Sequence, residues 1–368
     1  FGFVSALEAS HRANLQESAL EASRRACTVY CSGSLLSSVQ LSGIFEDSKT
    51  FVDMPMSFNP ETIITRWTTL EEQWSKNGSS VPAEVIAKFV NAHFLEAGSD
   101  LDEYVPRDWQ ENPAFLKEVA PEYKKWAADL NALWKTLGRE VSDSVRQNPQ
   151  RHSFVPRRRP MIVPGGRFRE SYYWDSLWIV KGLLVCEMVD SAVDVIENLL
   201  DDIELWGFVP NGARIYYTDR SQPPVLSEMV KTILEYDRQA GEALLTKAWK
   251  PLNSEYEFWM RDTKTHCDGH ALRIEVNGTM FTANRYHSSS YTPRPESYAE
   301  DVALATTIMT TATSTTDDDD ITKNNDLMNA VRSGAETGWD FSSRFIDDTE
   351  GSRPMPVATA ENYERLLR

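Results

Sequence analysis

Apolar residues recur at helical spacing along nearly the whole chain, and this periodicity constrains its fold more than any other feature. Four of them are separated by 4, 3 and 4 positions, which places them on one face of a helix: Ile63, Trp67, Leu70 and Trp74. Asn59-Pro60-Glu61 supplies an N-cap residue, a first-turn proline and a first-turn acid. Similar stripes run through residues 86–94, 126–137, 174–188 and 245–259. The chain is therefore expected to be mostly helical.

Strand signals are sparse. The best is residues 272–281, where alternation around Asn277-Gly278 predicts one short β-hairpin with a type I′ turn. The threonine-rich run at 306–316 and the acids Asp317 to Asp320 are interpreted as a solvated surface loop, because four adjacent carboxylates point in different directions. No linker divides the chain, so residues 1–368 are expected to form a single domain: an all-α toroid of helices whose loops build a site at one end.

The charge balance excludes several classes of partner. Lys and Arg number 38 against 55 Asp and Glu, a net charge of −17, which has the wrong sign for binding nucleic acid or anionic lipid. The run Arg157 to Arg159 is accordingly interpreted as a solvated turn. The most apolar stretch, 177–189, is interrupted by Lys181 and Glu187, so no membrane span is predicted.

The cysteines and glycosylation sequons bear on the compartment. Four scattered cysteines favour buried or idle thiols over a disulfide, although a pair stays open: Cys27, Cys31, Cys186 and Cys267. Sequons at Asn77 and Asn277 lean toward a secreted or cell-surface protein. The chain begins at Phe1, so no targeting signal is visible.

A metal or a cofactor is not expected. His266, Cys267 and His270 have a metal-like spacing, but no second ligand pair lies near them in sequence.

Polar, aromatic and turn-forming residues concentrate in four segments that read as loops: residues 164–175, 207–224, 293–298 and 334–344. Each mixes Arg, Asn or Gln with carboxylates and rings, the set of donors and acceptors that a neutral polyhydroxyl ligand requires. In the third segment an extended backbone would direct Arg294 and Glu296 to the same side. In the fourth, Asp340 follows Trp339, and an acid held against an indole ring is desolvated and keeps its proton to higher pH.

Taken together, the segments resemble the trehalase family, glycoside hydrolase family 37. The family's first signature is matched by Pro-Gly-Gly-Arg-Phe at 164–168 with Trp174-Asp175, and Arg-Ser-Gln-Pro-Pro, Arg-Pro-Glu-Ser and Gly-Trp-Asp-Phe-Ser-Ser-Arg follow in the family's order. An earlier segment at 39–53 also matches. The resemblance implies an (α/α)6 barrel that hydrolyses α,α-trehalose to two glucoses with inversion at the attacked carbon.

Carried over by position, Asp340 matches the family's general acid. Positions that line the family's sugar sites are matched by Arg167, Trp174, Asp175, Asn211, Arg220, Ser221, Gln222, Arg294, Pro295, Glu296 and Gly338. The resemblance implies that Trp174 offers its ring to a glucose, that Asp175 and Glu296 accept hydroxyl hydrogen bonds, and that the arginines donate to sugar oxygens. Trp178 is expected to remain in the core.

One feature of the family is not found. Its general-base Glu lies beyond a second signature, a Gln-Trp-Asp segment, and neither occurs before Arg368. The barrel is therefore expected to be incomplete at its C-terminal end, with exposed apolar stripes, and the chain alone to hydrolyse little.

Two alternatives stay open: a sugar-binding or regulatory remnant without hydrolysis, and an (α/α)6 glycosidase for a different glucoside. If the chain by itself is active, a base is needed within it, with four candidates: Glu170, Asp175, Glu296 and Glu336.

Overall fold

The computed structural model describes residues 17–155, 157–264, 269–311 and 317–340. Its N-terminal part is a group of helices around a core that includes Tyr30, Phe51 and Trp67. Residues 17–30 are helical and are followed by α2 (Ser34–Leu41), α3 (Lys49–Val52), α4 (Pro60–Ser75) and α5 (Ala83–His93). α4 begins at Pro60 as predicted, but the Asn59 side chain accepts a hydrogen bond from Arg151 and caps no backbone N–H.

A small antiparallel sheet joins this group to the rest of the chain. It has the strand order β1 (Leu101–Glu103), β2 (Gly138–Val141) and β3 (Met161–Ile162). Around it lie α6 (Phe115–Glu118), α7 (Lys124–Leu137) and α8 (Asp143–Gln147), with short 3-10 helices at Pro121–Tyr123 and Pro149–Arg151. The sheet was not predicted, because its strands are too short to show an alternating pattern.

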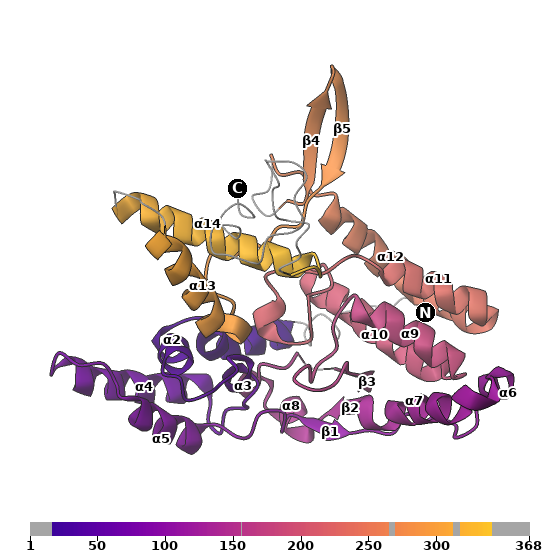
Figure 1. Cartoon of the computed structure of the whole chain (residues 1–368), viewed down its shortest axis with the longest axis horizontal. Helices are drawn as coiled ribbons and strands as arrows, with labels where there is room; N and C mark the ends of the chain where they lie inside the picture. Colours follow the sequence, from indigo (N-terminus) through magenta and orange to yellow (C-terminus); the bar gives the residue numbers. More distant parts are fainter. Residues whose placement is uncertain (1–16, 156, 265–268, 312–316, 341–368) are drawn as a thin grey trace, which may run out of the picture.

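The largest helical layer consists of α9 (Asp175–Val185), α10 (Val189–Trp206), α11 (Leu226–Tyr236) and α12 (Arg238–Trp259). α10 packs against the other three, and Figure 1 shows them side by side. Its apolar positions Ile196, Leu199 and Ile203 are almost completely buried in the core between them.

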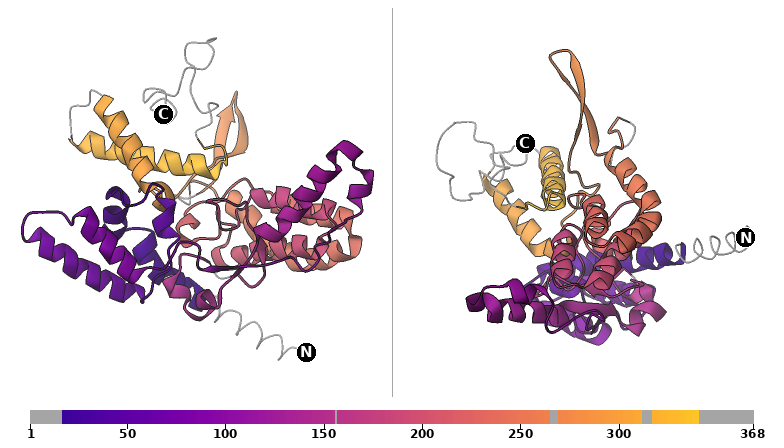
Figure 2. Two further views of the ribbon diagram at one scale, coloured as in Figure 1. Left: turned by 60° about the horizontal axis from the view of Figure 1, so that its bottom comes forward. Right: turned by 90° about the vertical axis from the view of Figure 1, so that its right-hand side faces the viewer.

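The chain continues through β4 (Ala271–Val276) and β5 (Thr279–Asn284), then α13 (Tyr298–Thr311) and α14 (Asp317–Glu336). The predicted hairpin is confirmed, with φ of 51° at Asn277 and 76° at Gly278, as a type I′ turn requires. It projects away from the helices in Figures 1 and 2. The loop prediction for 306–320 is wrong where the structure describes this run: α13 continues to Thr311, and Asp317 to Asp320 open α14, while residues 312–316 lie outside the described residues.

The predicted fold class is confirmed: the chain is mostly helical, with a short hairpin. Helices that follow one another pack as pairs, α9 with α10, α11 with α12 and α13 with α14. Such pairs are the units from which an (α/α)6 barrel is built, and the described part of the chain contains some of them. None of its helices is both long and apolar enough to cross a membrane.

Several helices carry apolar side chains on solvent-exposed faces. On α9, Trp178 is 62% exposed, so its assignment to the core is wrong: its neighbours Leu177 and Val180 occupy the buried face instead. Further exposed apolar residues lie on α7 and α12: Trp126, Leu130, Leu133, Leu245, Trp249 and Tyr256.

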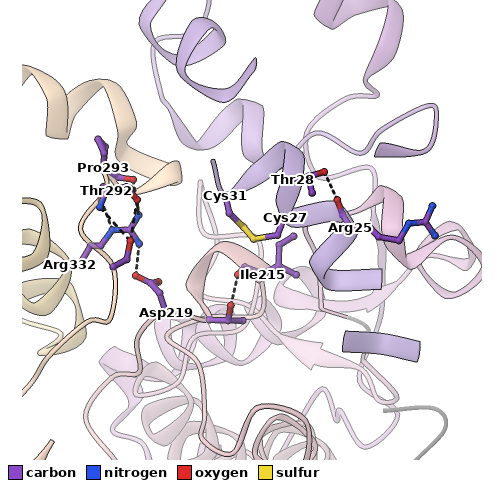
Figure 3. Close-up of a disulfide and its surroundings, with 11 residues drawn as sticks. Arg25, Cys27, Thr28, Cys31, Ile215, Asp219, Thr292, Pro293 and Arg332 are labelled. Carbon is purple, nitrogen blue, oxygen red and sulfur yellow. Dashed lines mark hydrogen bonds and ion pairs between the residues drawn. A yellow bond between two sulfur atoms is a disulfide. The ribbon is translucent and has the colours of Figure 1, made fainter. Parts of the chain in front are cut away.

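Two other expectations need correction. Cys27 and Cys31, one helical turn apart, form a disulfide (Figure 3), whereas Cys186 is a buried free thiol and Cys267 lies outside the described residues. Arg157 is not solvated but buried in an ion pair with Asp202.

The two residues after Arg157 also have acidic partners. Arg158 pairs with Asp201, and Arg159 with Glu197. These ion pairs, rather than a nucleic-acid surface, account for the arginine run.

Candidate active site

A cavity of about 340 Å³ lies where the four segments meet, a size suited to a small organic ligand. Each of the four segments contributes to it. Its lining is Pro164, Arg167, Phe168, Tyr172, Asp175, Asn211, Tyr217, Arg220, Gln222, Arg294, Glu296, Ser297, Ala335 and Asp340. The fold therefore gathers residues that are up to 176 positions apart in sequence, from Pro164 to Asp340.

Loops at helix ends deliver these side chains. The first segment leads into α9, whose first residue is Asp175, and the second connects α10 to α11. The third was predicted to be extended; only Arg294 is, and Pro295–Ser297 forms a 3-10 helix (η4) directly before α13. Arg294 and Glu296 nevertheless both reach the cavity. Asp340 follows the end of α14 by four residues.

Each of the three cavity arginines is held by a carboxylate. Arg167 and Asp47 form two hydrogen bonds of 2.7 and 2.6 Å. Asp47 belongs to the early segment at 39–53, which thus reaches the site through this contact.

Arg220 is buried and donates from Nη2 to Glu296 Oε1 at 2.7 Å. The attraction of Arg220, and then of Arg294, lowers the pKa of Glu296 although burial opposes it. Glu296 therefore stays ionised, and among the described residues nothing donates to its other oxygen, Oε2, which is buried. An ionised acceptor of this kind suits a ligand hydroxyl group.

Arg294 is held by Asp301, in the first turn of α13. Its Nη1 lies 3.8 Å from Asp340 Oδ2. This contact connects the third segment to the fourth.

The two aspartates of the cavity keep their protons more readily than free aspartates. The Asp340 side chain is 42% exposed, and its partial burial raises its pKa, an effect that the nearby Arg294 and Arg220 only partly offset. Burial also raises the pKa of Asp175. A carboxyl group that stays protonated to higher pH is suited to general acid catalysis.

Behind the cavity lies a network of buried charges. Tyr172 donates a hydrogen bond to Glu170 and shares one of 2.8 Å with Tyr217. Glu170 is fully buried, and ion pairs of 2.8 and 3.2 Å join it to Lys49 and Arg214. Because its carboxylate oxygens are occupied by these buried ion pairs, Glu170 is not suited to accept a proton from a water molecule.

Four predicted site residues are not part of the cavity lining. Trp174 lies next to it: its backbone N–H donates to Gln222 Oε1, and its ring packs on Gly338. Gly338 has φ of 68°, and a Cβ there would lie 2.9 Å from the Trp174 ring. Ser221 is buried and donates to the Val209 carbonyl, while the Pro295 carbonyl accepts from Gln40.

The aromatic lining was not predicted. It consists of Phe168, Tyr172 and Tyr217, and all three belong to the segments already singled out by composition. Their place in those segments was the available signal; what the sequence did not reveal is which rings face the cavity and which face the core.

Of the metal-like group His266, Cys267 and His270, only His270 belongs to the described residues. His270 Nε2 lies 3.3 Å from both carboxylate oxygens of Glu336. No group of three or more possible metal ligands occurs in residues 17–155, 157–264, 269–311 and 317–340.

Comparisons with known proteins identify one family. The chain is 38% identical to trehalase from Oryctolagus cuniculus over 320 residues, which are 86% of this chain and 51% of that protein. It is 37% identical to trehalase from Homo sapiens over 319 residues, with the same shares. It is also similar to the solved structure of neutral trehalase Nth1 from Saccharomyces cerevisiae, with 27% identity, a TM-score of 0.37 and coverage of 50% of this chain and 34% of that one.

The chain spans about half the length of the curated relatives it matches. The family model described as trehalase matches residues 43–361, which includes all four segments and the early segment from residue 43 onward. Because this match covers far more than half of the residues, the chain belongs to the trehalase family.

Proposed function

We propose that this chain supplies the general acid and sugar-binding residues of a site that hydrolyses α,α-trehalose to two glucoses with inversion. The observation that carries the proposal is the cavity itself: eight residues expected from the resemblance line it together, and all four segments contribute to it. Its three arginines are each paired with a carboxylate, which suits a neutral polyhydroxyl ligand rather than an ion. The relatives that the chain resembles over 86% of its length are named trehalases.

In the proposed reaction Asp340 is the general acid. It gives its proton to the glycosidic oxygen while the bond from that oxygen to the anomeric carbon breaks. A water molecule attacks the same carbon from the opposite face, and a second carboxylate takes the proton of that water. The raised pKa of Asp340 supports its role, because the acid must hold a proton before the reaction.

The other cavity residues bind and orient the sugar. Glu296, kept ionised by Arg220, accepts a hydrogen bond from a sugar hydroxyl. Arg167 and Arg294 donate to sugar oxygens from positions fixed by Asp47 and Asp301. Phe168 and Tyr217 offer apolar surface to the sugar rings.

The test is glucose release from trehalose by the full-length gene product. Asp340→Asn should lower kcat by about 10³-fold or more and leave trehalose binding, measured by calorimetry, nearly unchanged. The matched control is Asp326→Asn, an exposed residue of α14, which should keep wild-type activity. Detection of α- and β-glucose in equal initial amounts by NMR would support inversion, whereas α-glucose alone would indicate retention. Normal turnover by Asp340→Asn would contradict the assignment, and trehalose binding without any hydrolysis by the wild type would favour a sugar-binding remnant.

A further inference from the structure

Asp301 holds the guanidinium of Arg294 from one side. Its Oδ1 accepts from Nη2 at 2.7 Å, and its Oδ2 accepts from Nε at 3.0 Å and from the Arg294 backbone N–H at 2.8 Å. Both residues are nearly buried, with 2% and 6% of their surface exposed. A fork of parallel hydrogen bonds in a buried place fixes both the position and the orientation of the guanidinium plane.

The opposite side of the same guanidinium faces Asp340. Nη1 lies 3.8 Å from Asp340 Oδ2, which is within ion-pair range but longer than a direct hydrogen bond. Arg294 thus stands between two carboxylates, and it forms hydrogen bonds with the first and a looser ion pair with the second. If Arg294 were not held, its planar fork could approach Asp340 and form the same paired hydrogen bonds with it.

We propose that Asp301, which does not line the cavity, is a positioning residue for the acid: it holds Arg294 at ion-pair distance from Asp340 and prevents a closer, paired contact. The inference rests on the proposed role of Asp340. It assigns a function to the first turn of α13 (Tyr298–Thr311), which belongs to none of the lining loops.

The other charges around Asp340 agree with this arrangement. Arg294 and Arg220 favour its ionised form, whereas burial and Glu296 favour the protonated form. Arg220 is itself held, by Glu296 and Asp219. With both arginines fixed, the balance leaves the pKa of Asp340 above its ordinary value. If Arg294 were released and formed paired hydrogen bonds with Asp340, the pKa of Asp340 would instead fall below its ordinary value.

The experiment is the pH dependence of kcat for Asp301→Asn in the full-length protein. The alkaline limb, where the acid loses its proton, should move to lower pH by about one unit, since a neighbouring cation lowers a carboxyl pKa by this order. Two changes act in the same direction: one negative charge is lost, and Arg294 is released toward Asp340. At pH 7 the rate should fall about tenfold.

The matched control is Glu300→Gln. Glu300 is the adjacent residue in the same helical turn, and its carboxylate accepts from Ser48 rather than from an arginine. This variant removes an equal charge without releasing Arg294, so the limb should move much less than in Asp301→Asn. An equal shift in both variants would overturn the inference, as would a uniform loss of rate in Asp301→Asn without a shift.

If Asp301→Asn does not fold, Asp301→Glu gives the second test. The charge is retained and the fork is displaced by one methylene group, so a smaller shift in the same direction is expected, and an unchanged limb would overturn the inference. The two proposals fail separately: an active Asp340→Asn contradicts the role of the acid, whereas an inactive Asp340→Asn with an unshifted Asp301→Asn contradicts only the role of Asp301.

Discussion

Arg167 and Asp47, 120 positions apart in sequence, meet through two hydrogen bonds, Nε to Oδ2 at 2.7 Å and Nη2 to Oδ1 at 2.6 Å. The pair is partly exposed, so it contributes little to stability. Its effect is to fix the orientation of the Arg167 guanidinium at the cavity.

Asp47→Asn should therefore weaken trehalose binding by about tenfold, the effect of losing one charge-assisted hydrogen bond, and change the free energy of unfolding by less than about 1 kcal/mol. Calorimetric titration and urea denaturation measure the two quantities. Asp129→Asn, which removes an exposed ion pair with Lys125 on α7, is the control and should change neither. Unchanged affinity in Asp47→Asn would show that Arg167 needs no support.

Gly338→Ala should impair the site through Trp174. The residue has φ of 68°, and its new Cβ would meet the indole at 2.9 Å, so the ring or the backbone before Asp340 must move. We expect a loss of trehalose affinity of about tenfold or more, measured by calorimetry. Gly78→Ala has the same φ of 68° but no atom within 4 Å of the added Cβ. It separates backbone strain from contact with the ring and should leave the affinity unchanged; equal losses in both variants would assign the effect to strain.

Glu336, the last residue of α14, connects this helix to two loops through hydrogen bonds. Its fully buried carboxylate accepts from the backbone N–H groups of Ser221 and His287. Glu336→Ala leaves both donors unsatisfied and should cost about 2–4 kcal/mol of unfolding free energy, whereas Glu336→Gln retains a carbonyl acceptor and should cost less.

Urea denaturation measures both values for Glu336, with Asp326→Ala on the exposed side of α14 as the control. Equal losses for Ala and Gln would contradict the role of the acceptor. The same buried contacts argue against Glu336 as a base for water.

The stability of the fold should depend on Glu255. Burial raises the pKa of this carboxyl group to about 7 in the folded chain, although the Tyr173 hydroxyl donates to it. Since its ordinary value is 4.5, the folded state binds more protons than the unfolded state between these two pH values. The unfolding free energy should therefore fall as the pH rises through this window, by up to about 3 kcal/mol.

Glu255→Gln removes the titrating group and should flatten that dependence, as measured by urea denaturation at pH 5 and pH 8. Glu257→Gln, an exposed residue on the same helix α12, should retain it. A wild-type slope in Glu255→Gln would place the pH dependence elsewhere.

Helical periodicity was sufficient to predict α4, α5, α7, α9 and α12, because long amphipathic patterns are strong local signals. It could not tell which face of α9 is buried: Trp178 is as apolar as its neighbours, and only the packing of α10 and α11 decides that Leu177 and Val180 point inward. The short strands β1 to β3 had no local pattern to detect. The Cys27–Cys31 disulfide was not favoured, because two cysteines one turn apart are equally compatible with free thiols.

The site was predictable to the extent that its motifs are contiguous. Arg220, Glu296 and Asp340 were found in this way, and the structure brings them together. Of the carboxylates that hold the arginines, Glu296 was singled out, but Asp47 and Asp301 were not. Asp47 lies 120 positions from Arg167, and Asp301 lies seven positions from Arg294. Neither pair forms until the chain is folded.

The pairing of every cavity arginine with a carboxylate has an electrical consequence. The positive charges of Arg167, Arg220 and Arg294 are balanced locally by Asp47, Glu296 and Asp301, so these three cations are compensated before a ligand enters. A neutral sugar then displaces no counterions, and its affinity should be nearly independent of salt concentration. The net charge of −17 repels other polyanions at a distance, yet it exerts no force on an uncharged disaccharide. Under the proposed function, the outer surface therefore discriminates between molecules by their charge, and the cavity discriminates by their pattern of hydroxyl groups.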